Sequence, residues 1–510
     1  MKSKKPIVFA SRFVIIFLSI LAQVAMMLGL FFVLGKKYAW VEIVLNVLGA
    51  LLFLYLSNKD QPAVFKLPWL ILILLVPVFG IILYATFGNV KLTKKQLGRY
   101  RKIYDERHDD YYRQEQVLKS MQAENCKGLS TVKYLRSATS LPVFDNSSTA
   151  FLNSGEAFFQ SLCEQISRAE KYVFLEYFIV EEGVMLGGVL SAIEEVVARG
   201  VEVYFMYDDV GSISKVPLKF EKELQSKGIN AKRFFKFAPI VSVRHNNRDH
   251  RKIAVIDGKV GFMSGANIAD EYINEKRPFG RWRDSAVKIE GQAVDSLVRL
   301  FVQLYNMSGG DLYEEDYICT RHQSYSGGYV LPFGDSPAPI DDDKVFENVY
   351  LDIISRADKY LYITTPYLIV DTNLTDALKS AVRRGVDVRI IIPQNPDKKA
   401  IYTMTKKSCL NLMTAGVKVY AYRDGFIHSK TFLSDGEVAT VGTANLDYRS
   451  LVHHFECGVL LCNTPSINDL YADFLNLFDY ETELCTQESL KLNFFERLIS
   501  SVLGLFSTLM

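Results

Sequence analysis

The chain has few cysteines, and none of them is spaced for pairing or for metal binding. Its seven Cys are scattered between Cys126 and Cys485 without a CxxC pair, which favours free thiols in a reducing compartment over a disulfide framework. The net charge of +2 also lacks the basic excess expected of a protein that coats nucleic acid. At 510 residues and 49% hydrophobic composition, the chain is long and apolar enough for two or three folded domains.

Charged residues are nearly absent from three stretches of the first ninety residues. The three apolar runs are residues 13 to 35, 39 to 58 and 67 to 88. Each is long enough to cross a bilayer, and the second is interrupted only by Glu42 and Asn46. The third contains Pro77 and Gly80, which predict either a kinked span or a re-entrant hairpin. Because the first run is too long for a signal peptide and further runs follow it, we predict a transmembrane region over 1–90 with two or three crossings.

Basic residues flank this region on both sides. They are Lys2, Lys4, Lys5 and Arg12 before it, and Lys91, Lys94, Lys95, Arg99, Arg101 and Lys102 after it. Because basic flanks favour the cytoplasmic side, we expect a multi-pass protein of the cell membrane whose catalytic domains are cytoplasmic. The charged, Tyr-rich segment 91–129 is predicted to be a polar juxtamembrane linker.

The rest of the chain is a tandem repeat. "ISRAEKYVFLEYFIV" at 166–180 recurs as "ISRADKYLYITTPYLIV" at 354–370, and "ARGVEVYFMYDD" at 198–209 recurs as "RRGVDVRIIIPQ" at 383–394. In both copies, strand-like runs rich in Val, Ile, Tyr and Phe alternate with helical segments, which is typical of an α/β sandwich with a buried sheet. The predicted units are a first α/β domain at 130–325, a second at 326–488 and an amphipathic C-terminal segment at 489–510. That last segment is expected to lie either on the bilayer or on the protein's own surface.

One pattern of four polar residues occurs in both halves. A His is followed by a Lys two places on, an Asp five further and an Asn ten beyond that, in "DHRKIAVIDGKVGFMSGANIADEY" (249–272) and "GFIHSKTFLSDGEVATVGTANLDY" (425–448). The residues are His250, Lys252, Asp257 and Asn267 in the first half, and His428, Lys430, Asp435 and Asn445 in the second. A single copy would be weak evidence, but two copies at matching places in a repeat indicate a shared function.

The Asp-Gly pair in each copy predicts a two-residue hairpin turn. In the first copy this turn places Asn267 opposite Arg248. Direct partners share a face and side chains alternate along each strand, so His250, Lys252 and Asn267 are expected to converge unless a bulge shifts the register. Such a patch suits a phosphate, because Lys attracts its oxygens, Asn donates neutral hydrogen bonds, and His attacks phosphorus or transfers a proton. Two patches together would support displacement in two steps through a phosphohistidine.

The motif has two other interpretations. A divalent metal is disfavoured because Lys252 and Lys430 face the same patch, repel cations and are not usual ligands, so we expect no metal and no cofactor. Asp257 and Asp435 are counted among the candidate catalytic residues, although Asp before Gly is also common in turns for purely structural reasons.

These motifs resemble the phospholipase D superfamily, in which a His-Lys-Asp signature occurs twice. Two further details match, "GTANLDYRS" at 442–450 and an acid after each motif, Asp284 in "GRWRDSAVKIEG" and Glu456 in "HHFECGVLL". From about residue 60 to the C-terminus the sequence is similar to bacterial cardiolipin synthases. The resemblance implies that Asp284 and Glu456 each hydrogen-bond to the His of their own half.

The same resemblance implies a reaction and its partners. A phosphatidyl group would pass from one phosphatidylglycerol to another, releasing glycerol and forming cardiolipin, with His250 as nucleophile and His428 as general acid and then base. The reverse assignment stays open, as do a phospholipase D hydrolysing phospholipids to phosphatidic acid and a catalytically silent membrane scaffold. A nuclease is disfavoured because the chain offers no extended basic track. The expected partners are phosphatidylglycerol, other membrane phospholipids and the bilayer, with a homo-oligomer left open.

Overall fold

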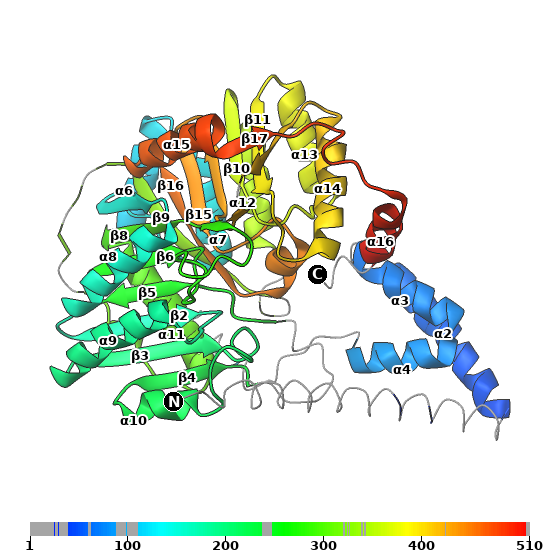
Figure 1. The fold of residues 1–510 in the computed structure, drawn as a ribbon, viewed down its shortest axis with the longest axis horizontal. Coiled ribbons are helices and arrows are strands. Elements are labelled where there is room, and N and C mark those ends of the chain that lie inside the picture. The colour runs from blue at the N-terminus through cyan, green and yellow to red at the C-terminus, as the bar shows by residue number, and fades with distance from the viewer. Residues whose placement is uncertain are drawn as a thin grey trace.

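Two mixed β-sheets form the body of the protein (Figure 1). The computed structural model describes residues 39–59, 63–87, 111–236, 247–319, 327–337, 343–423 and 425–505, with residues 25, 29, 98, 322, 323, 325 and 340 as single positions. The first sheet has seven strands in the order β1-β8-β6-β5-β2-β3-β4. The second has eight in the order β17-β12-β11-β10-β14-β15-β16-β9. Apart from the added strand β17, the two orders match position by position, so the sequence repeat is a repeat of topology.

The strands are short and largely buried. Those of the first sheet are β1 (Ser147–Leu152), β2 (Tyr172–Tyr177), β3 (Glu202–Asp208), β4 (Asn230–Phe234), β5 (Ile253–Ile256), β6 (Val260–Ser264) and β8 (Ala286–Gly291). Those of the second are β9 (Tyr329–Asp335), β10 (Tyr360–Thr364), β11 (Asp387–Pro393), β12 (Lys418–Tyr422), β14 (Thr431–Ser434), β15 (Val438–Gly442), β16 (Glu456–Cys462) and β17 (Thr482–Leu484). A separate parallel pair joins β7 (Arg281–Arg283) to β13 (Gly425–Ile427), and thus one half to the other.

Helices cover the sheets and separate them. In the first half they are α6 (Tyr111–Ala123), α7 (Leu129–Thr139), α8 (Gly155–Ser167), α9 (Val184–Ala198), α10 (Phe220–Ser226), α11 (Val294–Met307) and η2 (Glu314–Asp316). In the second they are α12 (Val345–Arg356), α13 (Thr372–Arg383), α14 (Lys399–Met413), η3 (Arg449–His453), α15 (Ser466–Asn476), η4 (Leu477–Glu481) and α16 (Phe494–Leu505). With sheets buried between helices, the predicted α/β class with two similar domains is confirmed.

Alternate residues of a central strand face two different cores. In β2, Val173 and Leu175 are fully buried in the cluster that includes α8 and α9. Phe174 points the other way and stacks on Phe301 of α11 with ring centroids 4.2 Å apart. The cluster on that side runs without interruption into the second sheet. Because both faces are covered, every residue of the strand is buried, Glu176 included, rather than alternating between buried and exposed.

Helix α6 corrects part of the predicted polar linker. Val117 and Met121 are buried, and the Gln114 side chain bonds both the N–H and the C=O of Val143 at 3.0 Å. Lys127, just after the helix, pairs with carboxylates of the second half. Residues 111–128 are therefore packed against the body, while residues 91–110 lie outside the described residues apart from one position.

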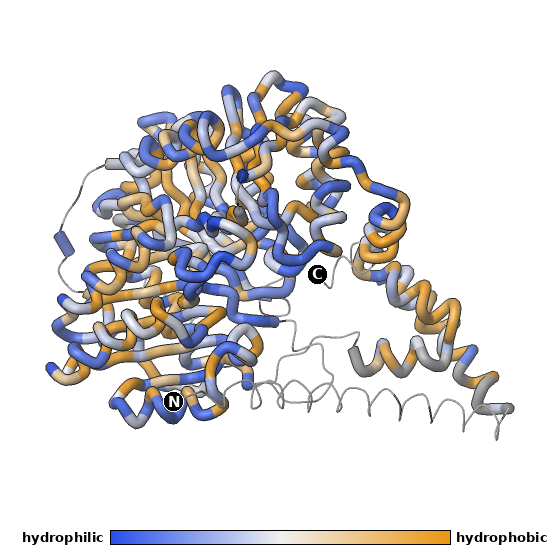
Figure 2. The backbone as a smooth tube through the Cα atoms, in the orientation of Figure 1, coloured by the Kyte–Doolittle hydropathy of each residue, from blue (hydrophilic) through white to orange (hydrophobic). Residues whose placement is uncertain are grey.

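The apolar N-terminal helices lie to one side of the body. They are α2 (Ala39–Asn58), α3 (Ala63–Leu75) and α4 (Pro77–Phe87), and Figure 2 shows them as largely hydrophobic. The third predicted run bends at Val76 into two helices, and a Cβ at Gly80 would lie 2.8 Å from the Ile73 backbone. The run therefore forms two helices, α3 and α4, that contact each other, while the predicted entry into a membrane stays a prediction.

Membrane crossing by these helices is a separate question. Within the described part of the chain, every helix falls short of the length and apolarity needed to cross a bilayer. The first predicted span, residues 13 to 35, lies outside the described residues except for two positions.

The predicted amphipathic C-terminal segment contains helix α16. One side of it contacts α14 and α3, with Glu496 bonded to Lys406 of α14 at 3.1 Å. Phe494 and Phe495 on the other side are 75% and 71% exposed. The helix thus packs on the protein and still presents apolar side chains beside the N-terminal helices.

Candidate active site

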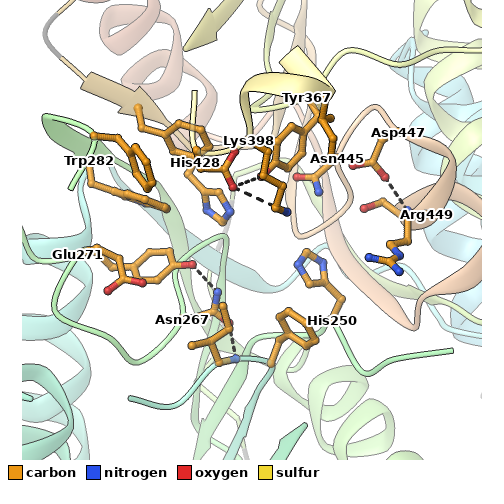
Figure 3. A pocket seen from close by; sticks show the side chains of 18 of the residues that line it. His250, Asn267, Glu271, Trp282, Tyr367, Lys398, His428, Asn445, Asp447 and Arg449 are labelled. Atoms are coloured by element: carbon orange, nitrogen blue, oxygen red, sulfur yellow. Dashed lines mark hydrogen bonds and ion pairs between the residues drawn. The ribbon is translucent and has the colours of Figure 1, made fainter. Parts of the chain in front are cut away.

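The two motif histidines face each other across one cavity (Figure 3). The cavity has a volume of about 1100 Å³ and lies between the halves, with His250, His428, Asn267 and Asn445 in its wall. Each His lies just before the strand that leads to its hairpin turn, β5 in the first half and β14 in the second. The structure therefore brings the two copies of the motif into a single site.

Each histidine is held by an acid from the other half. The Nδ1 of His250 lies 2.9 Å from both carboxylate oxygens of Glu456, and the Nδ1 of His428 lies 2.6 Å from Asp284. The expectation that each acid bonds the His of its own half is wrong. The acids themselves were identified correctly as partners of the two rings, but the pairs are exchanged.

Backbone contacts between the halves explain the exchange. The N–H of His250 donates to the carbonyl of Phe455 at 2.9 Å, and the N–H of His428 donates to that of Arg283 at 2.7 Å. Phe455 and Arg283 each come directly before the acid. The segment that carries each acid thus runs beside the other half's His, an arrangement that β7 and β13 extend.

Burial sets the charge on the two rings. It lowers the pKa of His428 to about 4 and that of His250 well below its ordinary value, although the paired carboxylates oppose the change. Both rings are therefore neutral at pH 7 when no anion is bound. With Nδ1–H donating to the carboxylate, the tautomer that the pairing favours leaves the Nε2 lone pair free to act as nucleophile or base.

The two motif lysines are buried behind these rings. The Lys252 ammonium donates to the carbonyl of His250 at 2.6 Å, and that of Lys430 donates to the carbonyl of His428. Burial lowers their pKa values to about 8 and about 7. A buried ammonium without full solvation gains strongly from a bound anion, so the pair favours a phosphate between the rings.

The hairpin register differs from the prediction by one residue. Ile256 pairs with Val260, so the turn has three residues rather than two, and Asp257 has a φ of 56°. Asn267 nevertheless lines the cavity, because β6 ends at Ser264 and the loop after it turns inward. The Asn267 oxygen accepts from the Ile179 N–H at 2.9 Å and its nitrogen donates to a Tyr hydroxyl, which fixes the amide.

Asp257 and Asp435 lie away from the cavity, which corrects their assignment as catalytic residues. Asp257 accepts the backbone N–H groups of Glu170, Lys171 and Tyr172 at 2.7 to 3.0 Å. Asp435 accepts the equivalent three in the second half at 2.8 to 2.9 Å, and the Lys127 ammonium at 2.8 Å. Each carboxylate ties its turn to the start of the adjacent strand, so the role is structural.

We expect Asp435→Ala to lower the free energy of unfolding by about 3 kcal/mol, because several charge-assisted hydrogen bonds are lost. Burial raises the pKa of Asp435, but Lys127 and the backbone N–H groups lower it by more, so the pKa lies below its ordinary value. The stabilisation by Asp435 is therefore complete at pH values above the pKa of this carboxyl in the unfolded chain. It is lost as the pH falls through the lower pKa that the same carboxyl has in the folded protein. Thermal denaturation at pH 7 and pH 3 measures it.

The control is Asp358→Ala, whose side chain is 70% exposed and pairs with the same Lys127. It should change stability by less than about 1 kcal/mol. Activity per folded molecule is expected to be unchanged in both variants, and a large loss of turnover in a stably folded Asp435→Ala would contradict the structural role.

Aromatic residues around the rings were not identified from the sequence. Trp282 lies 5.3 Å from His428 and His454 lies 5.3 Å from His250, both between ring centroids. Each residue stands two positions before the acid of its half. His454 lies in the "HHFECGVLL" stretch that pointed to Glu456, but a local pattern cannot place it against His250 because that contact joins the two halves.

One group in the described part of the chain has the spacing of metal ligands. Potential ligand atoms of His250, His454 and Glu456 lie within 4.8 Å of one another, a set that Zn²⁺ accepts. The carboxylate is already bonded to His250, and the charge of Lys252 acts on the same ring. These donors fit a hydrogen-bonded pair beside a buried cation better than a metal centre.

Comparisons with known proteins agree with this geometry. Residues 162–297 and 350–478 match a family model described as "Cardiolipin synthase, PLD-like domain". A cardiolipin synthase of Oceanobacillus iheyensis is 33% identical over 88% of this chain and 93% of its own. Cardiolipin synthase 2 of Bacillus anthracis is 31% identical over 90% and 88%.

A solved structure supports the fold independently. The phosphatidylserine synthase of Haemophilus influenzae superimposes with a TM-score of 0.59 at 15% identity, over 75% of this chain and all of that one. At that identity the likeness concerns the fold alone. The family model matches both halves of the chain, and the relatives align over most of this chain and most of their own length. This chain therefore belongs to the cardiolipin synthase family of phospholipase D-like proteins.

Proposed function

We propose that the cavity transfers a phosphatidyl group from one phosphatidylglycerol to the free glycerol hydroxyl of another, forming cardiolipin and glycerol. The observation that carries the proposal is the facing pair of neutral histidines, His250 and His428, with two buried lysines behind them. A phosphate bound between the rings would then have a nucleophile, a proton carrier and anion-binding groups around its phosphorus atom. Family membership supports the choice of lipid substrates.

The proposed reaction has two steps. In the first, Nε2 of His250 attacks phosphorus, the bond from phosphorus to the glycerol oxygen breaks, and His428 gives that oxygen a proton. In the second, a hydroxyl of the acceptor lipid loses its proton to His428 and attacks the same phosphorus, which releases His250. Binding of the anionic substrate offsets the lysine charges that help to depress the pKa of His428, so the ring gains a proton more readily than in the free enzyme.

The surroundings of the rings support His250 as the nucleophile. His428 packs against Trp282 and Tyr272 at centroid distances of 5.3 and 5.4 Å, and aromatic faces stabilise a cationic ring. His250 packs against Phe178 at 5.0 Å and against His454 at 5.3 Å, and burial together with the neighbouring His454 lowers the pKa of His250. This asymmetry suits a neutral attacking ring on one side and a proton-carrying ring on the other.

A place in the cell membrane, with the catalytic domains on the cytoplasmic side, is part of the proposal. Support comes from the apolar runs with their basic flanks and from the exposed side chains of α2, such as Trp40 and Leu51 at 65% and 58%. A cavity fed from the bilayer meets lipid hydroxyls at high local concentration, which favours transfer over attack by water. Hydrolysis to phosphatidic acid is the competing outcome.

Wild-type chain produced in cells is expected to remain in membranes washed with carbonate. Those membranes, or protein purified from them and placed in vesicles of phosphatidylglycerol, should release glycerol and form cardiolipin in equal amounts. Chromatography of labelled lipids and assay of free glycerol measure both products. Phosphatidic acid in place of cardiolipin would favour the hydrolase, and an inactive but membrane-bound protein would favour the scaffold.

A further inference from the structure

One wall of the cavity is provided by the first half alone. Asp284 follows Asn267 by 17 positions, whereas Glu456 follows Asn445 by 11. The additional residues fall in a loop over 274–280, whose Lys276, Arg277, Pro278 and Phe279 line the cavity. This loop makes the site asymmetric although the two histidine motifs match.

The loop is attached to the residues that surround His428. The Asn274 side chain accepts the Trp282 N–H at 2.7 Å and donates to the Trp282 carbonyl at 2.9 Å. Arg277 donates from Nε to the Asn274 carbonyl at 3.3 Å. Tyr272 before the loop and Trp282 after it both contact the His428 ring. The loop therefore projects from the His428 side of the cavity, where the leaving and entering alcohols must lie.

The charge of the loop is positive. Lys276 lies 2.9 Å from Glu181, which it shares with Lys215, and 3.6 Å from Asp270, so these two acids balance the two lysines. Arg277 is exposed and has no carboxylate within ion-pair distance among the described residues. Glu271 also lines this wall, and burial raises its pKa above the ordinary value.

We propose that Arg277 and Lys276 bind the phosphate of the acceptor lipid. The inference rests on the proposed function, in which an acceptor hydroxyl must reach His428. Three carbons link that hydroxyl to the acceptor's own phosphodiester, which then extends past His428 toward the loop. The bond from the hydroxyl oxygen to phosphorus forms, the bond from phosphorus to His250 breaks, and His428 takes the proton.

Such a subsite distinguishes acceptors by their charge. Phosphatidylglycerol carries a phosphate that the loop can bind, whereas water and free glycerol carry none. Binding energy from this remote group positions the lipid hydroxyl for attack, and so favours synthesis over hydrolysis.

The test compares two reactions of the full chain in phosphatidylglycerol vesicles. Cardiolipin formation needs the phosphate-bearing acceptor, whereas exchange of labelled glycerol into phosphatidylglycerol uses the same histidines with an acceptor that has no phosphate. In the double variant Lys276→Gln and Arg277→Gln, the ratio of cardiolipin formation to glycerol exchange should fall at least about tenfold, as expected for loss of charge-assisted hydrogen bonds. Arg277→Lys, which keeps the charge, should retain most of the ratio.

The control is Lys259→Gln, an exposed lysine that pairs with Glu170 outside the cavity and should leave the ratio unchanged. An equal fall of both reactions in the double variant, or no fall in either, would overturn the acceptor subsite. Failure of the proposed function gives a different pattern, because the wild-type chain itself would then form no cardiolipin.

Discussion

His250→Ala should abolish both cardiolipin synthesis and covalent labelling of the protein. Loss of an attacking group costs at least about 10⁴-fold in turnover. The residual Lys252, Lys430 and His428 can still bind phosphate, but no atom remains to form the phosphorus–nitrogen bond. The measurement is rapid mixing with phosphatidylglycerol labelled in its phosphate, followed by alkaline denaturation, because such bonds are labile to acid.

His428→Ala gives the matched comparison. Without a proton carrier, labelled protein should form slowly and then persist, because neither step can move its proton. His322→Ala is the control, since His322 pairs with Asp295 at 3.1 Å and does not line the cavity. Label that survives in His250→Ala and disappears in His428→Ala would reverse the two roles.

Glu456→Gln should reduce turnover roughly 10³-fold while the protein stays folded, as loss of an orienting carboxylate does in other acid–histidine pairs. Glu456 belongs to the second half, yet its two oxygens lie 2.9 Å from Nδ1 of His250 in the first. The Gln amide can present its NH2 group instead of its oxygen to that ring nitrogen. Because the amide is neutral, it also stabilises the imidazolium less than the carboxylate does. Single-turnover labelling should therefore slow in step with steady-state turnover.

Chemical modification distinguishes acid–histidine pairs formed between the two halves from pairs formed within one half. Acylation by diethyl pyrocarbonate, followed by peptide mass analysis, should slow at His250 in Glu456→Gln and at His428 in Asp284→Asn. The opposite pattern, in which each acid affects the His of its own half, would disprove the contacts described above. Thermal denaturation of both variants checks that the fold is retained.

Much of the architecture follows from local sequence. The repeat of "ISRAEKYVFLEYFIV" predicted two α/β units, and the sheets have matching strand orders. The spacing of His, Lys and Asn selected residues that the fold collects in one place, since a strand and the loop after it fix them locally. The apolar N-terminal run containing Pro77 and Gly80 was expected to be kinked or doubled back, and a bend is observed there.

What sequence could not predict depends on contacts between distant segments. The partner of each acid is decided by the packing of one half on the other, which no local pattern encodes. The role of Asp257 was ambiguous because a turn residue and a catalytic residue look alike until the neighbouring backbone is in place. The register was missed by one residue, since Asp-Gly is compatible with both two- and three-residue turns.

The exchanged contacts follow the rule of a two-fold dimer interface within a single chain. His250 meets the Phe455 segment and His428 meets the Arg283 segment, so interchanging the halves maps each contact onto the other, as in an isologous association. A half expressed alone would contain its own His but not the acid that bonds to that His. Two copies of one half could restore a His–acid pair, but only as a symmetric dimer in which both pairs are identical. Because the halves are joined in one chain, one half can differ in sequence from the other. The site can then bind the donor and the acceptor lipid differently, which a symmetric dimer could not do.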